Sequence, residues 1–438
     1  MRRSLSRIFS LTLSIPLLLA ILVACGSGTT GSNPGTATTG STIIKIATDF
    51  PTSGKDTSNG KPAENGAHLA VDEANKNHTI PGYTIEFVPK DDVGPSGSHD
   101  PSVGAQNVRA LIGDALVAGI IGPFNSSVAK AEMPITNRAP IVQISPANTN
   151  TCLTQRGANV DCTGANDFVP TLRPTGKVTY FRVAGTDSHQ GPAGADYLFK
   201  TLHYKSVYVI DDAETYGIGI ADSFSNEWKA LGGTYLGRSS EPSTTTSYVS
   251  LLTQIASKHP EVIYFAGVDS TGGILVRQQM RQVPALANLP FAGGDGIVTP
   301  DFASTIGLSG GPVYGTIAVK DTVQNPATAS FKAKYLAIYS TINVYSAAAY
   351  DCANILIQAI KTALANGAHT PKDSGDAADA KNFRQAVINA VQGISYDGVT
   401  GHQSFDQNGD TNNKVFTIYK LDTLNNKPDW KFLTAVTV

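Results

Sequence analysis

The chain has 438 residues, of which 41% are hydrophobic and 16% charged, with 33 basic residues against 35 acidic ones. That is more apolar sequence than one hydrophobic core usually holds, so two lobes of about 200 residues each are predicted. The near balance of charge gives no support to a nucleic-acid groove or a basic membrane patch.

The first 24 residues have the form of a secretory signal peptide. Three arginines precede a largely apolar run from Ile8 to Val23. A transmembrane anchor is the alternative, but the run is shorter than the ~20 residues that a span needs, and polar residues and a proline interrupt it. The segment Leu22-Val23-Ala24-Cys25 resembles the bacterial lipobox, which implies cleavage before Cys25 and acylation of that cysteine. Buried acyl chains would hold the protein at the outer face of the cell membrane.

A flexible tether follows this cysteine. From Gly26 to Thr42 the residues are almost all Gly, Ser, Thr, Ala, Asn and Pro, which are too polar and too small to form a core. The predicted N-terminal organisation is therefore a signal peptide over 1–24 and a lipidated cysteine with its tether over 25–42. Removal of 1–24 takes away three arginines and no acids, which changes the formal net charge from −2 to −5.

From residue 43 onward, apolar strand runs alternate with amphipathic helical stretches, a pattern typical of a parallel sheet covered on both faces. Asp100 suits the N-cap of one helix and Pro101 its first position. The pattern restarts after Gly185, so two doubly wound α/β lobes are predicted. The predicted strands are 43–47, 83–88, 116–121, 141–144, 206–210, 261–266, 290–292 and 415–419. The predicted helices are 61–76, 101–112, one beginning near 126, 218–231, 248–258, 273–282, 327–339, 346–365 and 377–391.

Two short segments stand where strand runs end. Asn125-Ser126-Ser127 opens a helix, and Ser145-Pro146-Ala147-Asn148-Thr149 closes the strand that follows it. The first turn of a helix has free N–H donors and a partial positive charge, and hydroxyl side chains add donors without adding net charge. Ligands of open α/β sheets bind beyond the carboxyl ends of the strands, so a carboxylate-binding crevice between the lobes is predicted.

Seven segments in order make the chain resemble the type I periplasmic binding proteins of the leucine/isoleucine/valine and related amino-acid importers, from Ile43 to the C-terminus. They are 49–54 (DFPTSG), 122–127, 145–149, 187–192 (DSHQGP), Tyr216-Gly217, Gly294-Asp295-Gly296 and 405–410 (FDQNGD). The resemblance implies two doubly wound parallel-sheet lobes joined by a multi-strand hinge. It implies an N-terminal lobe over 43–184 plus 322–411 and a C-terminal lobe over 185–321 plus 412–438.

The resemblance also implies roles for residues of the crevice. The ligand carboxylate would be bound by Ser126 and Thr149, beside Asn125. The ammonium would be held by the Ala147 carbonyl, the Thr149 hydroxyl and the acid Asp295. Tyr216 would close over the ligand from the second lobe. Plainer interpretations stay open, in which Ser126 is only a helix N-cap, Asp295 a solvated turn acid and Tyr216 a packed aromatic residue.

Two departures from the family pattern bear on the ligand. Positions that often carry a pocket aromatic are Asn59 and Val268 here, so a branched aliphatic ligand is not assured and Asn59 becomes a candidate hydrogen-bonding group. Asp187 and Gln190 are interpreted as structural residues that fix the crossing between the lobes. His189 is interpreted as a surface or cleft-rim histidine rather than a pH switch.

The cysteines after position 25 are predicted to have structural roles. Cys152 and Cys162 flank a polar loop in an oxidising compartment, and a disulfide between them is predicted. Cys352 lies inside an apolar helical run and is predicted to be a buried small hydrophobe.

No catalytic residue, cofactor or metal is predicted. The segment 307–311 matches G-x-S-x-G around Ser309, but a nucleophile elbow needs a strand before it and a helix after it, and here that order is reversed. The predicted function is that of a monomeric, extracytoplasmic substrate-binding lipoprotein of an ABC importer, which presents an amino acid to permease subunits and binds no nucleic acid. One alternative is the same scaffold binding an amide, urea or aromatic acid, or serving as a sensor ectodomain. A secreted hydrolase using Ser309 is the other.

Overall fold

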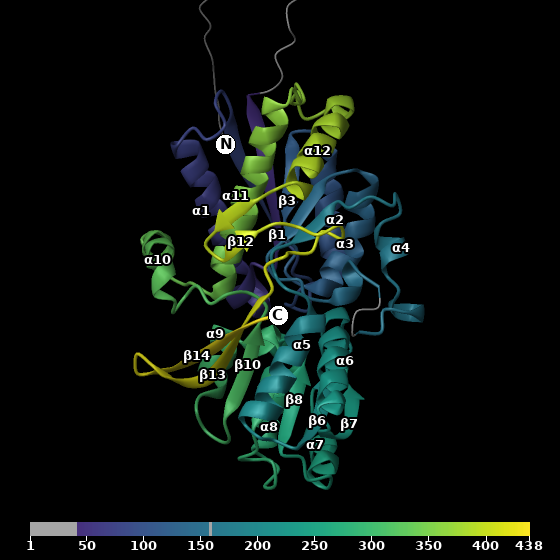
Figure 1. Cartoon of the computed structure of the whole chain (residues 1–438), viewed down its shortest axis with the longest axis vertical. Coiled ribbons are helices and arrows are strands. Elements are labelled where there is room, and N and C mark those ends of the chain that lie inside the picture. The colour runs from purple at the N-terminus through teal and green to yellow at the C-terminus, as the bar shows by residue number, and fades with distance from the viewer. Residues whose placement is uncertain (1–41, 157–159) are drawn as a thin grey trace, which may run out of the picture. The chain divides into compact units, whose positions relative to one another are not determined.

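The structure is a computed structural model that describes residues 42–156 and 160–438. The predicted signal peptide, the acylation of Cys25 and the tether up to residue 41 lie outside these residues. Two separate sheets, each flanked by helices, organise the described chain (Figure 1). No helix within the two described ranges is both long enough and apolar enough to span a bilayer.

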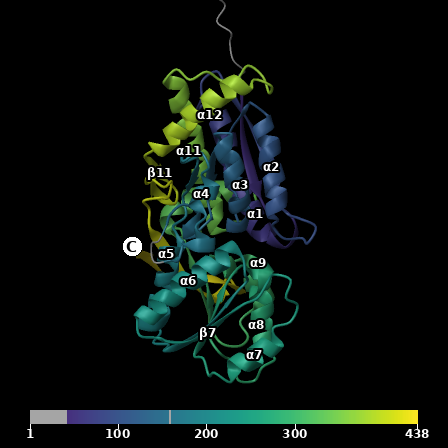
Figure 2. The same cartoon turned by 90° about the vertical axis from the view of Figure 1, so that its right-hand side faces the viewer.

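The first sheet consists of β1 (Ile43–Phe50), β2 (Thr84–Asp91), β3 (Val117–Ile121), β4 (Val142–Ser145) and β5 (Tyr180–Arg182). It is parallel throughout, in the order β2-β1-β3-β4-β5. One face is covered by α1 (Thr57–Lys76), α11 (Val344–Ala365) and α12 (Ala377–Gln392), and the other by α2 (Pro101–Gly113) and α3 (Ser126–Arg138). Figure 2 shows α12 and α2 on opposite sides. Successive side chains of a strand point to opposite faces of the sheet. Ile44 and Ile46 therefore pack in the hydrophobic core under α1 and α11, and Ala47 packs in the core under α2.

The second sheet consists of β6 (Ser206–Asp211), β7 (Thr234–Ser240), β8 (Val262–Ala266), β9 (Phe291–Gly293), β10 (Val313–Ile317), β13 (Val415–Leu424) and β14 (Lys427–Thr437). Its order is β14-β13-β10-β9-β8-β6-β7, and only the pairings of β13 are antiparallel. On one face lie α5 (Asp187–Asp196) and α6 (Thr215–Ala230), and on the other α7 (Val249–Ala256), α8 (Ile274–Met280) and α9 (Pro300–Ile306). The prediction of two doubly wound lobes is thus confirmed.

The chain crosses between the lobes three times, after β5, after β10 and after β12 (Gly401–Gln403), which pairs with β11 (Tyr396–Gly398). These crossings form the predicted multi-strand hinge. The Gly185 N–H donates to the Ala318 carbonyl across 2.8 Å. A Cβ at Gly185 would lie 2.4 Å from the ring of Phe416, so only glycine lets the crossings pack this closely. The predicted lobe boundaries, as residue numbers, stay a prediction.

Several elements escaped prediction for physical reasons. Strand β5 has three residues between polar loops, and α5 contains Pro192 and two glycines, which lower helix propensity. Strands β7 and β14 are the two edges of the second sheet, where most side chains are partly exposed and no apolar run forms. The predicted helix 327–339 is shorter, as α10 (Ala329–Leu336), and a one-turn helix, α4 (Val169–Leu172), was not predicted.

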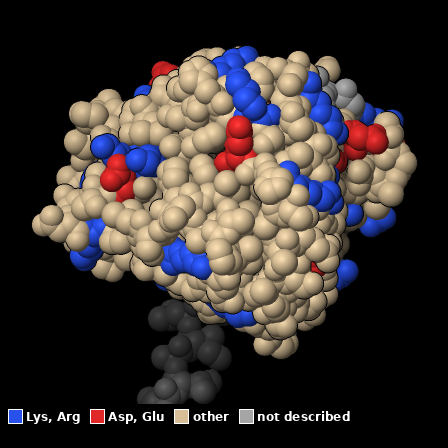
Figure 3. All heavy atoms as spheres, turned by 90° about the horizontal axis from the view of Figure 1, so that it is seen from below, with Lys and Arg blue, Asp and Glu red and all other residues tan. Residues whose placement is uncertain are grey.

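Surface charge is dispersed on the face that Figure 3 shows. Lysine and arginine side chains stand among uncharged residues, with a few acidic ones between them. A dense basic stripe of the kind that follows a phosphate backbone is not seen on this face. The predicted absence of nucleic-acid binding is not tested further by this view and stays a prediction.

Candidate functional site

The first donor segment lies at the start of α3. Gly122, with φ of 127°, makes the turn that leads from β3 to this helix, and a Cβ there would lie 2.4 Å from the Asp49 carbonyl. The N-cap residue is Asn125, not Ser126, so the interpretation of Ser126 as a plain N-cap is wrong. Ser126 is the first helical residue and is 2% exposed. Its hydroxyl therefore lies at the first turn of α3, beside N–H groups that have no acceptor within the helix.

The second segment is locked by its own first residue. The Ser145 hydroxyl donates to the Pro123 carbonyl (2.7 Å) and accepts from the N–H groups of Ala147 (3.2 Å) and Asn148 (3.0 Å). This turn leaves Thr149 1% exposed, and its hydroxyl makes no hydrogen bond of good geometry within the described residues, although the carboxyl of Asp187 lies near it. A buried hydroxyl without a good hydrogen bond costs about 1–3 kcal/mol, which a bound ligand can recover.

A buried arginine that the sequence analysis missed holds this segment in place. Arg182 is fully buried and donates from Nε to Asp410 Oδ1 at 2.6 Å. From Nη1 it donates to the carbonyls of Asn148 (3.2 Å) and Asn150 (2.8 Å), on both sides of Thr149. Residues 406–410 form a turn, in which the Gly409 N–H donates to the Asp406 carbonyl. Its Asp410 has the added role of neutralising Arg182.

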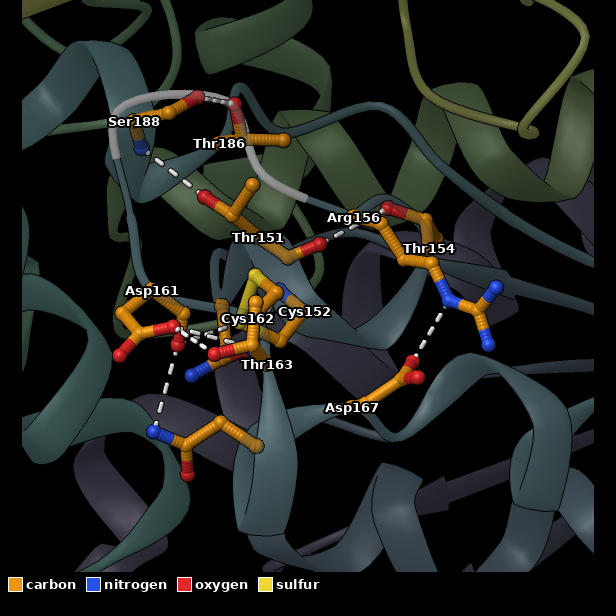
Figure 4. The surroundings of a disulfide bond; sticks show 12 residues. Thr151, Cys152, Thr154, Arg156, Asp161, Cys162, Thr163, Asp167, Thr186 and Ser188 are labelled. Carbon is orange, nitrogen blue, oxygen red and sulfur yellow. Dashed lines mark hydrogen bonds and ion pairs between the residues drawn. A yellow bond between two sulfur atoms is a disulfide. The ribbon is translucent and has the colours of Figure 1, made fainter.

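The predicted disulfide joins Cys152 and Cys162, with an S–S distance of 1.99 Å, so this prediction is confirmed. Figure 4 shows it beside Thr151, whose hydroxyl accepts from the Ser188 N–H at 3.0 Å. Because Ser188 lies in the first turn of α5, this bond connects the segment after Thr149 to the second lobe. Cys352 is buried with a free thiol, as predicted.

Asp295 follows β9 in the second lobe and is only 9% exposed, so the interpretation as a solvated turn acid is wrong. Its Oδ1 accepts from Gln190 Nε2 (2.9 Å) and from the Tyr216 hydroxyl (2.8 Å), and its Oδ2 accepts from the Tyr345 hydroxyl (2.7 Å). Burial raises the pKa of Asp295, and these three hydrogen bonds oppose the rise. Tyr216 is therefore more than a packing residue, since it orients the acid.

The two lobes are joined beside this acid by five residues that the sequence analysis did not connect, here called the clasp: Asp56, His99 and Ser127 of the first lobe with Glu214 and Ser270 of the second. The His99 side chain is 2% exposed, with Nδ1 at 2.9 Å from Asp56 Oδ2 and Nε2 at 3.0 Å from Glu214 Oε2. Ser127 donates to Glu214 Oε2 at 3.0 Å, and Ser270 donates to Asp56 Oδ1.

The clasp is an ionised cluster. Burial opposes a charge on His99, but hydrogen bonds to Asp56 and Glu214 outweigh it and raise the pKa of His99 well above its usual value. Burial likewise opposes charge on both carboxylates, and their hydrogen bonds to His99 lower the pKa of Asp56 and of Glu214 nonetheless. Within the clasp, the hydrogen bonds from His99 and Ser127 to Glu214, and from Ser270 to Asp56, all cross between the two lobes.

The remaining predicted structural residues lie at the crossing. The Asp187 N–H donates to the Thr149 carbonyl at 2.8 Å, and Gln190 orients Asp295, in agreement with their interpretation as positioning residues. His189 is half-buried and stacked on Phe416 with 6.2 Å between ring centroids, so it belongs to the hinge rather than to the cleft rim.

One cavity collects the whole predicted ligand set. Its lining includes all eight predicted positions, which are Asn59, Asn125, Ser126, Ala147, Thr149, Tyr216, Val268 and Asp295. The lining also includes residues that were not predicted: His99, Phe124, Ser127, Asp212, Glu214 and Gly296. The space for the centres of water-sized atoms is about 30 Å³. One isolated water needs ~10–15 Å³ by this measure, so little free space is left between the lining side chains.

Two other sequence features lie away from this cavity. Around Ser309 the order is α9, turn and β10, which is the reverse of a nucleophile elbow. Among the described residues, no group of three or more His, Cys, Asp or Glu side chains is arranged to hold a metal ion.

A sequence model of the family described as periplasmic binding protein matches residues 43–427. The chain belongs to this family. The match covers both lobes and the hinge, so it agrees with the resemblance found in the sequence and with the observed fold.

Three known proteins illustrate the likeness. A Leu/Ile/Val-binding protein of Rhizobium johnstonii is 26% identical over 384 residues, covering 86% of this chain and 92% of that protein. The branched-chain amino acid transporter substrate-binding protein of Streptococcus pneumoniae, solved with isoleucine, has a TM-score of 0.68 and 26% identity, covering 90% and 99% of the two chains. A solute-binding protein of an ABC transporter from R. palustris, solved with 4-hydroxybenzoate, has a TM-score of 0.73 and 18% identity, covering 90% and 97%.

Proposed function

We propose that this periplasmic binding protein is the extracytoplasmic, lipid-anchored substrate-binding subunit of an ABC importer, and that it closes on one amino acid. The observation that carries the proposal is the presence, in one cavity, of the first turn of α3 and of a buried carboxylate, Asp295. A zwitterion needs both, because its two charged ends require hydrogen-bond donors at one end and an anionic acceptor at the other.

The carboxylate end is assigned to the first lobe. Ser126 contributes a hydroxyl beside the free N–H groups of α3, and Thr149 contributes a buried hydroxyl that makes no hydrogen bond of good geometry within the described residues. Hydrogen bonds to a charged group are worth about 1.5–3 kcal/mol each. Two or three of them, less the cost of ordering the ligand, are compatible with micromolar affinity, which is about −8 kcal/mol.

The ammonium end is assigned to Asp295, with the Ala147 carbonyl nearby in the lining. Burial disfavours the charged form of Asp295, and a bound cation restores it. Since Ser126 and Thr149 belong to the first lobe and Asp295 and Tyr216 to the second, all contacts form together only in the closed protein. The ligand then shifts the hinge equilibrium by its differential affinity for that state.

An aromatic acid is the second candidate, because one structural neighbour was solved with 4-hydroxybenzoate. Such a ligand has a carboxylate but no ammonium, and it would leave the buried Asp295 without a cation. An amino acid therefore fits the cavity better. The role as an importer subunit rather than a sensor ectodomain is tested by neighbouring genes, where permease and ATPase subunits are expected and a sensor kinase would contradict the proposal.

The test is a thermal-shift panel of amino acids, amides and aromatic acids, followed by calorimetry on the hits. A ligand well above its dissociation constant raises the melting temperature by mass action. We expect an amino acid to do so, and expect Asp295→Asn and Thr149→Val each to weaken its binding at least tenfold while the ligand-free melting temperature stays near that of the parent. Binding of benzoates but of no amino acid, or unchanged affinity in both variants, would contradict the proposal.

A further inference from the structure

We propose that the ligand is a short amino acid whose side chain carries a hydrogen-bond donor, a hydroxyl or an amide, and that Glu214 accepts this hydrogen bond. The inference rests on the proposed function, because it concerns the same cavity. It assigns to Glu214 the choice of side chain, whereas Ser126, Thr149 and Asp295 read the groups that all amino acids share.

Glu214 has one carboxylate oxygen, Oε1, that no described residue uses as a hydrogen-bond acceptor. Its Oε2 accepts from His99 Nε2 and from the Ser127 hydroxyl, each at 3.0 Å. Among the described residues, none donates to its Oε1. The side chain is 27% exposed and lines the cavity, and it stands at the N-cap position of α6. A carboxylate held rigidly through one oxygen offers the other to the ligand in a fixed direction.

Neighbouring polar groups on this wall are already occupied. Both ring nitrogens of His99 are bonded within the clasp. Asp212 accepts from the Glu214 N–H (3.1 Å) through Oδ1, and from the Thr271 hydroxyl (2.6 Å) and the Val268 N–H (3.3 Å) through Oδ2. Within the described chain this leaves three lining groups with spare hydrogen-bonding capacity here, which are Glu214 Oε1, the side-chain amide of Asn59 and the buried Oδ1 of Asn125, and of these acceptors only Glu214 carries a charge.

An aliphatic side chain would be disfavoured at this wall. Closure over such a ligand would remove water from Glu214 Oε1 and supply no donor in its place, and a buried charge without a partner is costly. A site built to hydrogen-bond a ligand group rejects analogues that lack that group far more strongly than an apolar pocket rejects a missing methylene. Of the two positions that often carry aromatic walls, Asn59 is polar and Val268 is smaller than an aromatic residue, so less apolar surface is present there to offset this cost.

The small cavity favours a short side chain. About 30 Å³ is available to the centres of water-sized atoms, so a short side chain requires less rearrangement of the lining than a long one. Serine, threonine and asparagine meet both requirements. The prediction is sharpest for threonine and valine, which have nearly the same shape and differ by a hydroxyl in place of a methyl.

The experiment compares these near-isosteres by calorimetry on the intact protein. We expect threonine to bind at least tenfold more tightly than valine, and asparagine more tightly than leucine. In Glu214→Gln, the amide oxygen can satisfy His99 and Ser127, which leaves an NH2 donor facing the donor of the ligand. We therefore expect the preference for threonine over valine to fall at least tenfold in this variant.

Ser270→Ala is the matched control, because it removes a clasp hydrogen bond to Asp56 and does not line the cavity. It should change the affinities for threonine and valine by the same factor. Two results would overturn the inference. One is that valine binds the parent protein as tightly as threonine does, and the other is that Glu214→Gln weakens the binding of both ligands equally. The proposed function fails separately, if no amino acid binds or if Asp295→Asn leaves threonine affinity unchanged. The parent comparison of the two ligands decides the inference even if a variant does not fold.

Discussion

Two groups of acidic side chains inside this protein have opposite pKa shifts. In the clasp, Asp56 and Glu214 share the imidazole of His99, and the pKa of each carboxyl is lowered although burial acts the other way. A second group, here called the acid cluster, consists of Asp49 in β1, Asp92 directly after β2 and Glu132 in α3.

Within the described residues no cation forms an ion pair with the acid cluster, although the charge of His99 acts on Asp92 from a greater distance. Neither oxygen of Asp92 and not Oε1 of Glu132 has a hydrogen-bond partner among the described residues. Burial raises the pKa of Asp49 to about 6 and holds the pKa of Asp92 and of Glu132 well above the usual range. The comparison teaches that a cation within hydrogen-bonding distance, rather than depth of burial, decides which acids stay charged at neutral pH.

The largest effect is expected at Asp410, a buried acid outside both groups, whose cation is Arg182. Arg182→Met leaves Asp410 buried without its partner and releases the carbonyls on both sides of Thr149, so the free energy of unfolding should fall by about 3–5 kcal/mol. Urea denaturation measures this change. The double variant with Asp410→Asn should recover part of the loss. If Arg182→Met alone were as stable as the parent, the Arg182–Asp410 ion pair would not stabilise the fold, contrary to this prediction.

A smaller effect is expected from removing the clasp cation. His99→Gln keeps hydrogen-bonding groups but leaves Asp56 and Glu214 as two close anions from opposite lobes, which repel one another. Because the clasp forms only in the closed state, ligand affinity should fall roughly tenfold, or about 1.4 kcal/mol. Calorimetry with the best ligand measures it. Unchanged affinity would mean that the clasp does not contribute to closure.

The smallest effect, and the one with a definite pH sign, is expected in the acid cluster. The pKa of Glu132 is raised in the folded state. Above about pH 4.3 the carboxyl therefore loses its proton in the unfolded chain but keeps it in the folded protein. The free energy of unfolding falls as the pH rises through this range, until the pH passes the folded-state pKa. Glu132→Gln should therefore stabilise the protein by about 1 kcal/mol at pH 8 and little at pH 4. Melting curves across this range give the difference.

The clasp combines two signs, because the raised pKa of His99 acts in the same direction as that of Glu132, whereas the lowered pKa values of Asp56 and Glu214 act in the opposite direction. Because the pKa of His99 is raised in the folded state, its contribution to the stability of the closed protein is complete below about pH 6.5. This contribution is lost as the pH rises through the folded-state pKa of His99. Because the pKa of Asp56 and of Glu214 is lowered in the folded state, the contribution of these carboxylates to stability is complete above about pH 4.5. It is lost as the pH falls through their folded-state pKa values. A pH profile of affinity that is the same in the parent and in His99→Gln would contradict this assignment.

Local sequence pattern predicted most of the helices and the inner strands, because burial on both faces of a parallel sheet requires continuous apolar runs. The N-cap at Asp100 was also predictable, and its side chain accepts from the Ser102 N–H at 2.7 Å. The edge strands β7 and β14 and the short β5 carry no such run, so only pairing with their neighbours defines them.

By itself the sequence determined the α/β class, the disulfide pair and the positions of Ser126, Thr149 and Asp295 at the ends of strand runs, because parallel strands bring their carboxyl ends to one edge. Tertiary structure alone decided what surrounds them. His99 meets Asp56 and Glu214 across 43 and 115 residues of chain, and Arg182 meets Asp410 across 228. No periodicity records such contacts, since they depend on how two separately folded lobes meet and on which charges burial leaves in need of a partner.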